Sequence, residues 1–131
     1  MNDRPTVTEL IEAVRKFLED DVVPSAGGAQ KYQARVAAHV LSIVERELAS
    51  QDRHLRGEWQ RLAALLEEDA PFPETRAEQE SGIRARTEAL VARIRAGDAD
   101  AGPWRSALLT HLRETVDDKL EVARGPLRGE D

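Results

Sequence analysis

The sequence predicts an all-α protein, a five-helix and mostly antiparallel up-and-down bundle. Apolar residues recur at spacings of three and four through most of the chain, capping and breaking residues divide them into five segments, and no segment is a strand candidate. The chain of 131 residues has the length of one domain. We therefore expect a single helical domain over residues 1–131, with a flexible loop at about 68–82 and a solvated tail at 125–131.

The composition narrows the possible functions. There is no cysteine, which excludes disulfides, thiolate metal sites and thiol catalysis. The net charge is −6, whereas nucleic-acid binding requires clustered positive charge, so nucleic acid is not an expected partner. The N-terminal residues are not followed by an apolar run of the kind found in signal peptides or membrane spans. We expect a cytoplasmic protein that binds no membrane.

The first helix is expected over about residues 7–22. Thr6 and Glu9 have the spacing of a capping box, in which each side chain bonds the other residue's backbone amide. Pro24 lacks an amide hydrogen and is expected to end the helix. The Ser25-Ala-Gly-Gly28 segment then predicts a turn.

The second helix, about residues 29–49, is predicted to be central. Its apolar stripe is formed by Tyr32, Val36, Val40, Ile43 and Val44. A helix with so wide a stripe needs neighbours on at least two sides to keep that surface out of water. We therefore expect the other four helices to cover it and to leave its polar side chains in a sheltered setting.

The remaining helices follow from similar signals. Ser50 supplies a capping side chain before a third helix, which carries Trp59 and ends near Leu66. The following segment, residues 69–73, contains two prolines and cannot be helical, and Phe72 is expected to pack into the bundle. A fourth helix is clear only from Ile83 to the glycine at 97, because Gly82 weakens residues 74–82. A fifth helix runs from Pro103 to about Ala123.

Three histidines, His39, His54 and His111, are the only imidazoles of the chain. The sequence has neither the Glu-x-x-His pairs of helical di-metal sites nor a His-x-x-x-His pair, so no metal or other cofactor is expected. The histidines are interpreted as partly buried groups that bond to a neighbouring helix. Nothing in the sequence establishes an enzyme, and a binding role is favoured over catalysis.

Arg35 leaves two interpretations open. An arginine on a nearly surrounded helix either joins an ion-pair network with a neighbouring helix or helps to bind an anionic ligand. In the second case Arg35, His39 and Lys119 would be the donors of a polar pocket between the second and fifth helices. Trp59 and Trp104 also allow two interpretations: they are core residues, or they are anchors of an interface.

Three blocks of sequence carry a resemblance to a known family. They are residues 4–18, with Glu9-Leu-Ile-Glu-Ala-Val-Arg-Lys-Phe-Leu18, residues 35–48, with Arg35-Val-Ala-Ala-His-Val-Leu-Ser-Ile-Val-Glu-Arg-Glu-Leu48, and residues 112–123, with Leu112-Arg-Glu-Thr-Val-Asp-Asp-Lys-Leu-Glu-Val-Ala123. They resemble a bacterial family of small helical proteins classed as a domain of unknown function. The likeness covers most of the chain outside about 68–82. Family members commonly have asparagine where this chain has His39, and asparagine-proline where it has Arg124-Gly125.

Members of that family are often encoded beside an aminoglycoside-phosphotransferase-like kinase and an acyl-CoA dehydrogenase. The resemblance thus implies a context of acyl-CoA or phosphotransfer metabolism and no particular reaction. Our first hypothesis is a non-enzymatic accessory protein that binds such a partner enzyme or forms a homodimer. The alternative is a domain that binds, or acts on, a small anionic ligand, for example one related to acyl-CoA, through Arg35, His39 and Lys119.

Overall fold

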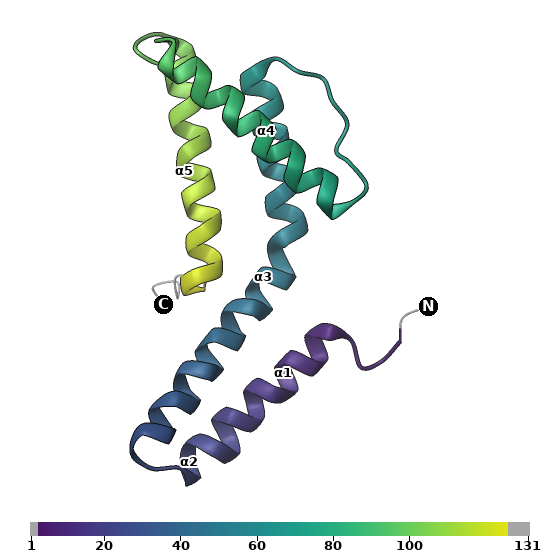
Figure 1. Ribbon diagram of the computed structural model, residues 1–131, viewed down its shortest axis with the longest axis vertical. Coiled ribbons are helices and arrows are strands. Elements are labelled where there is room, and N and C mark those ends of the chain that lie inside the picture. The colour runs from purple at the N-terminus through teal and green to yellow at the C-terminus, as the bar shows by residue number, and fades with distance from the viewer. Residues whose placement is uncertain (1–2, 126–131) are drawn as a thin grey trace, which may run out of the picture. The chain divides into compact units, whose positions relative to one another are not determined.

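The computed structural model describes residues 3–125, and the regular secondary structure within that range is helical, with no strand (Figure 1). The elements are α1 (Val7–Phe17), the π-helical turn η1 (Leu18–Val22), α2 (Val23–Ser25), α3 (Gly28–Leu66), α4 (Arg76–Arg95) and α5 (Pro103–Arg124). The all-α prediction is confirmed, but the number of helices is wrong. Residues 7–25 form one continuous run, so the described chain has four long helical segments instead of five. None of the described helices combines the length and apolar character that crossing a membrane requires.

The chain divides into two compact units. Unit 1 comprises Met1–Ser50 and Leu120–Asp131, and unit 2 comprises Gln51–Lys119. Helices α3 and α5 each contribute residues to both units. Of the expected tail at 125–131, only Gly125 belongs to the described residues; it has a positive φ of 78° and lies beside the guanidinium of Arg46.

The N-terminal helical run begins as predicted and ends later than predicted. The Thr6 hydroxyl accepts from the amide of Glu9, whose carboxylate accepts from the amide of Thr6, which confirms the capping box. Pro24 does not end the run, which continues to Ser25. The π-turn just before it, where the amide of Val23 bonds Leu18, rearranges the carbonyls that a proline would otherwise meet in a regular α-helix.

Helix α3 joins the second and third predicted helices without a break at Ser50. The Ser50 hydroxyl donates to the carbonyl of Arg46 at 2.7 Å, so it bonds back to the preceding turn. The predicted capping role of Ser50 is therefore wrong. Gly57 is also accommodated inside the helix.

Unit 1 has almost no core. Helices α1 and α3 run antiparallel (Figure 1), and the buried positions among its described residues are Ala34, Ala38, Ser50 and Gly125. Residues of the predicted apolar stripe of the central helix are exposed in the described part of the chain: Tyr32 is 70% exposed, and Val36 and Val40 are exposed as well. The expectation that the other helices enclose this segment is therefore wrong.

Unit 2, by contrast, has a well-packed core. Its buried members are Trp59, Leu62, Leu65, Ile83, Leu90 and Leu108, and the partly buried Phe72 and Trp104 pack against them. The Trp59 indole donates to the carbonyl of Ala70 at 3.0 Å and meets the ring of Phe72 edge-on, with centroids 5.8 Å apart. Phe72 thus packs as predicted, Trp59 is a core residue, and the partly buried Trp104 packs against that core.

Helix α4 begins inside the segment that was expected to be a flexible loop. Its first residue is Arg76, and the Thr75 hydroxyl caps it by accepting from the amide of Glu78. Gly82 does not interrupt the helix. A Cβ at Gly82 would lie 2.4 Å from the Trp59 indole, so glycine lets α4 and α3 approach closely. The loop therefore covers residues 67–75 only.

The contacts of α4 also show its direction relative to α3. Arg76 pairs with Asp52 near the start of the unit, and Arg93 donates to the carbonyl of Leu65 near the end of α3. Helix α4 therefore runs parallel to α3, whereas α5 is antiparallel, since Trp104 bonds Leu65 and His111 bonds Arg61. The loop of residues 67–75 returns along α3, in contrast to an up-and-down arrangement (Figure 1).

Candidate functional site

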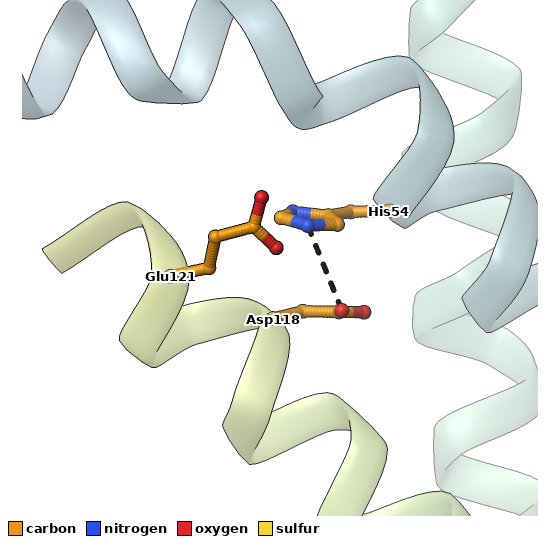
Figure 2. Close-up of side chains that lie close together, drawn as sticks. All are labelled: His54, Asp118 and Glu121. Atoms are coloured by element: carbon orange, nitrogen blue, oxygen red, sulfur yellow. Dashed lines mark ion pairs between the residues drawn. The ribbon is translucent and has the colours of Figure 1, made fainter. Parts of the chain in front are cut away.

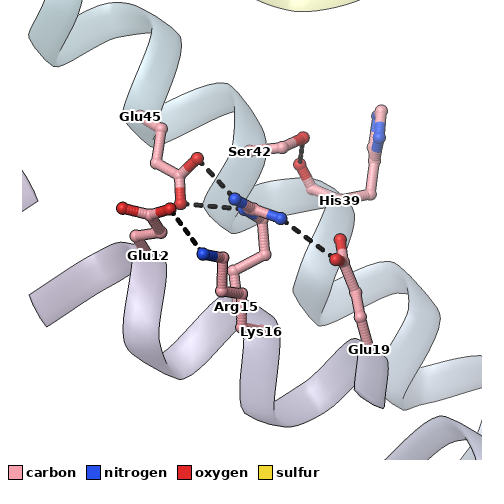
Figure 3. A network of polar contacts seen from close by, with 7 residues as sticks. All are labelled: Glu12, Arg15, Lys16, Glu19, His39, Ser42 and Glu45. Atoms are coloured by element: carbon pink, nitrogen blue, oxygen red, sulfur yellow. Dashed lines mark hydrogen bonds and ion pairs between the residues drawn. The ribbon is translucent and has the colours of Figure 1, made fainter. Parts of the chain in front are cut away.

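A network of ion pairs joins α1 to α3 in unit 1 (Figure 3). The Arg15 guanidinium donates from Nε to both carboxylate oxygens of Glu45, at 2.8 and 3.0 Å, and from Nη1 to Glu19 at 3.0 Å. The hydrogen bond to Glu45 raises the pKa of Arg15. One residue further on, Lys16 pairs with Glu12 at 2.9 Å, which raises the pKa of Lys16 and lowers that of Glu12. Each of these charged side chains therefore has a partner of opposite charge within unit 1.

Two of the three predicted ligand-binding residues lie together beside that network. Arg35 and His39 line a pocket of about 350 Å³ with Glu19, Val23, Ala38 and Ser42. The pocket is open, and both Arg35 and His39 are exposed, in contrast to the sheltered setting that was expected. In Figure 3 the imidazole of His39 points away from the ion pairs. Lys119, the third predicted residue, is exposed and belongs to unit 2.

Unit 2 contains a second polar cluster, centred on Arg61. Its Nε donates to Nδ1 of His111 at 3.1 Å and its Nη2 donates to the Thr115 hydroxyl at 3.2 Å. The same guanidinium lies 3.2 Å from a carboxylate oxygen of Glu114 and 3.7 Å from one of Asp118. Asp118 also pairs with Nε2 of His54 at 3.6 Å (Figure 2). These contacts connect the second half of α3 to α5.

The imidazole of His111 is neutral in this setting. Burial lowers its pKa, and the positive charge of Arg61 acts in the same direction. Because Nδ1 accepts from Arg61, the ring proton is carried by Nε2. Burial also raises the pKa of the nearby Glu58. His111 thus confirms the interpretation of a buried histidine bonded to a neighbouring helix.

A pocket of about 360 Å³ adjoins this cluster. Its apolar wall includes Leu65, Trp104 and Ala107, and its polar wall includes Arg61, His111 and Glu114. No serine lines it, and Arg61 is already engaged by its protein partners. Arg61 was not among the site residues predicted from the sequence. An arginine immediately before the buried Leu62 was the available signal, because such a residue needs a partner on the facing helix.

Unit 1 also has a surface formed by exposed apolar side chains of α1 and α3. We define the apolar face as Val7, Leu10, Val14 and Phe17 of α1 with Val40 and Val44 of α3, together with the partly buried Ile11, Leu18, Leu41 and Leu48. The six named first are all exposed; Val14 is 52% and Phe17 57% exposed.

Helix geometry places the two halves of this face on one side of the α1–α3 pair. Arg15 and Glu45 mark the line where the helices meet. Each residue turns a helix by about 100°, and in an antiparallel pair the positions just before two facing residues turn toward the same side. Val14 and Val44 therefore lie on the same side of that line, and Lys16 lies on the other side.

The apolar face contains no ionisable residue, and its side chains are large. Fully burying a valine, leucine or phenylalanine side chain contributes about 1.5–3 kcal/mol, so six that are roughly half exposed leave about 4–9 kcal/mol unrealised. An uncharged surface of this kind is typical of the centre of a protein interface. It is the feature of unit 1 that most clearly indicates a binding surface.

The fold and these sites define a small all-helical protein with polar clusters between its helices and an uncovered apolar surface. Residues 24–124 match the family described as "Domain of unknown function (DUF6285)", and the chain belongs to that family. No curated protein and no solved structure matches the chain. The expectation of a domain-of-unknown-function family is confirmed.

Proposed function

We propose that this chain is a non-enzymatic accessory protein that acts by binding protein. The apolar face of unit 1 is the observation that carries the proposal, because it exposes large apolar side chains without a charge among them. The resemblance described above makes a kinase-like or an acyl-CoA dehydrogenase-like protein the first candidates for a partner.

Purified candidates can be titrated with the chain in a calorimeter. Binding that is lost in the Val14→Glu variant would support the proposal, because a carboxylate placed in an apolar contact costs several kcal/mol unless it is paired. Val91→Glu on α4 is a suitable control, since Val91 is an exposed valine of unit 2. Equal binding by both variants would count against the apolar face as the contact surface.

The pocket at Arg35 and His39 supports a second candidate function, the binding of a small anionic ligand. Arg35 and His39 both line a volume of about 350 Å³, and Arg35 could meet a phosphate or carboxylate through paired hydrogen bonds. Lys119, the third donor expected from the sequence, belongs to unit 2 and does not line this pocket. In this alternative the occupant is related to acyl-CoA.

A thermal-shift titration with coenzyme A and short acyl-CoAs tests the alternative. A ligand at 100 times its Kd should add about 2.7 kcal/mol to the free energy of unfolding. Arg35→Gln and His39→Gln should abolish the shift if these side chains bind the anion, and Lys119→Gln tests the third donor separately. A shift that survives Arg35→Gln would assign the ligand to another site.

A further inference from the structure

We propose that the pocket of about 360 Å³ in unit 2 binds a small aromatic amine that also carries a hydrogen-bonding oxygen. The pocket lies between the end of α3 and the first half of α5, and all of its lining residues belong to unit 2. The inference is independent of the protein contact proposed for unit 1, because it concerns other residues and another kind of ligand.

The spacing of the lining residues explains why there is a pocket at this place. On each helix they recur at intervals of three and four, which puts them on one helix face; they are Arg61, Ala64 and Leu65 of α3 and Trp104, Ala107 and His111 of α5. The methyl groups of Ala64 and Ala107 leave space that longer side chains would fill. The resulting volume is at the lower end of the range for small-molecule pockets, about 300–1,000 Å³.

A buried hydrogen-bond donor lines this pocket. His111 is only 6% exposed, and because its Nδ1 accepts from Arg61, its Nε2 carries the ring proton. Within residues 3–125 this Nε2 has no hydrogen-bond partner. The buried polar side-chain atoms without a partner in that range are Arg76 Nη1 and Gln79 Oε1, so Nε2 of His111 stays accessible. An oxygen of a ligand in the pocket can accept this proton, and such a bond fixes the orientation of a ligand.

The aromatic wall of the pocket is held in a fixed position. The Trp104 indole N–H donates to the carbonyl of Leu65 at 3.0 Å, and the Arg93 guanidinium lies 4.2 Å from the ring centroid. The buried Leu65 side chain adds an apolar surface beside this ring. Aromatic rings pair favourably in offset or edge-on arrangements, so a preformed wall of this kind favours a ligand with an aromatic ring.

The charges of the pocket favour a cation. Glu67 and Glu114 line it together with Arg61, whose guanidinium lies 3.2 Å from Glu114 and 3.7 Å from Asp118. Two carboxylates thus face the single positive charge of Arg61, and Glu67 has no ion-pair partner in the described part of the chain. Burial lowers the pKa of His111, so its imidazole adds no positive charge. The potential in the pocket therefore attracts an ammonium group and opposes a carboxylate or phosphate.

Calorimetric titration of the full chain with tyramine tests the proposal, because tyramine combines an aromatic ring, an amine and a phenol oxygen. We expect saturable binding with a Kd of about 1 mM or tighter. The compound 3-(4-hydroxyphenyl)propionate has the same phenol with a carboxylate in place of the amine, and it should bind about 10-fold more weakly or worse. Phenethylamine lacks the oxygen and should bind about 5-fold more weakly. Absence of saturable tyramine binding up to about 10 mM, or equal binding of the amine and the carboxylate, would overturn the proposal.

Two pairs of variants assign the binding to this pocket. Ala107→Leu should abolish tyramine binding by filling the pocket, whereas Ala85→Leu, at an exposed alanine of α4, should leave it unchanged. Glu114→Gln should weaken binding about 5-fold, and Glu88→Gln, at an exposed glutamate of α4, is its control. Native tryptophan emission shows that each variant is folded, and Glu114→Gln remains informative if Ala107→Leu is not. Tyramine that binds each variant as tightly as its control would occupy another site and would contradict the proposal.

Discussion

At the scale of single residues, Trp59 illustrates how much of unit 2 depends on one side chain. Its ring is covered by the guanidinium of Arg86, 3.7 Å from the ring centroid, and Gly82 lies against its edge. Its indole N–H bonds the carbonyl of Ala70, which holds the returning loop. The loop of residues 67–75 and helix α4 are thus both positioned against this indole of α3.

Gly82→Ala should destabilise the protein even though alanine is the better helix former. The new Cβ would meet the indole of Trp59 at 2.4 Å, and overpacking of this kind costs about 1–3 kcal/mol, more than the roughly 1 kcal/mol gained in helix propensity. Gly57→Ala is the control, because its nearest neighbour is the flexible end of Arg61 at 3.3 Å, and it should be neutral or stabilising. Urea unfolding measures both. A more stable Gly82→Ala variant would contradict the close contact.

His111 gives a prediction about pH. Its pKa is lowered in the folded state, so between that value and its ordinary value of about 6.5 the unfolded chain binds more protons, and the free energy of unfolding rises with pH. Its contribution is therefore complete above about pH 6.5 and is lost as the pH falls through this window. The slope for one proton is at most about 1.4 kcal/mol per pH unit.

The measurement compares urea unfolding of the wild type and of His111→Gln between pH 5 and 7.5. The variant should show a smaller loss of stability on acidification. Glu58, whose pKa is raised, acts with the opposite sign, but it is present in both proteins and so largely cancels in the difference. His39→Gln, which removes an exposed imidazole of unit 1, is the control. Equal pH dependence of His111→Gln and wild type would show that His111 does not titrate as described.

At the scale of elements, α3 shows where sequence signals were sufficient and where they were not. The apolar periodicity on both sides of Ser50 predicts two helices correctly in type, and Thr6, Gly97 and Pro103 mark real helix ends or starts. Ser50 was misread because the same hydroxyl can cap a helix or bond to the carbonyl four residues earlier. Pro24 was misread because a π-turn upstream is not visible in the sequence.

The candidate sites were less predictable than the elements, for a physical reason. Arg35 and His39 are one turn apart on one helix, so their common pocket follows from local spacing. The Arg61 cluster depends on which face of α5 meets α3, and that is decided by tertiary packing. The exposed apolar face was predicted as buried, because a hydrophobic stripe identifies a surface that requires cover without identifying what covers it.

The continuity of α3 at Ser50 can be tested by mutation. If Ser50 capped a helix, Ser50→Ala would cost about 1 kcal/mol and Gln51→Pro, at the first helical position, would be tolerated. In the continuous helix Ser50→Ala should change stability little, whereas Gln51→Pro should cost about 3 kcal/mol or more. Helical ellipticity and urea unfolding distinguish the two. A harmless Gln51→Pro would show that the helix breaks at this point.

At the scale of the whole molecule, the apolar burial is unevenly distributed. The buried cluster that contains Trp59, Leu62 and Leu108 belongs entirely to unit 2, while the buried hydrophobic residues of unit 1 are Ala34 and Ala38. Since apolar burial is the main favourable term in folding, unit 2 should be much the more stable of the two in an isolated chain. Covering the apolar face of unit 1 would add to its stability.

Thermal unfolding should therefore show two transitions, the earlier one from unit 1. Excitation at a wavelength that selects tryptophan reports unit 2 through Trp59 and Trp104, and helical ellipticity reports both units. Ellipticity should begin to fall several degrees before tryptophan emission changes, because the buried apolar cluster that contains Trp59 belongs to unit 2. Coincident curves would contradict this prediction and would show that the two units unfold together.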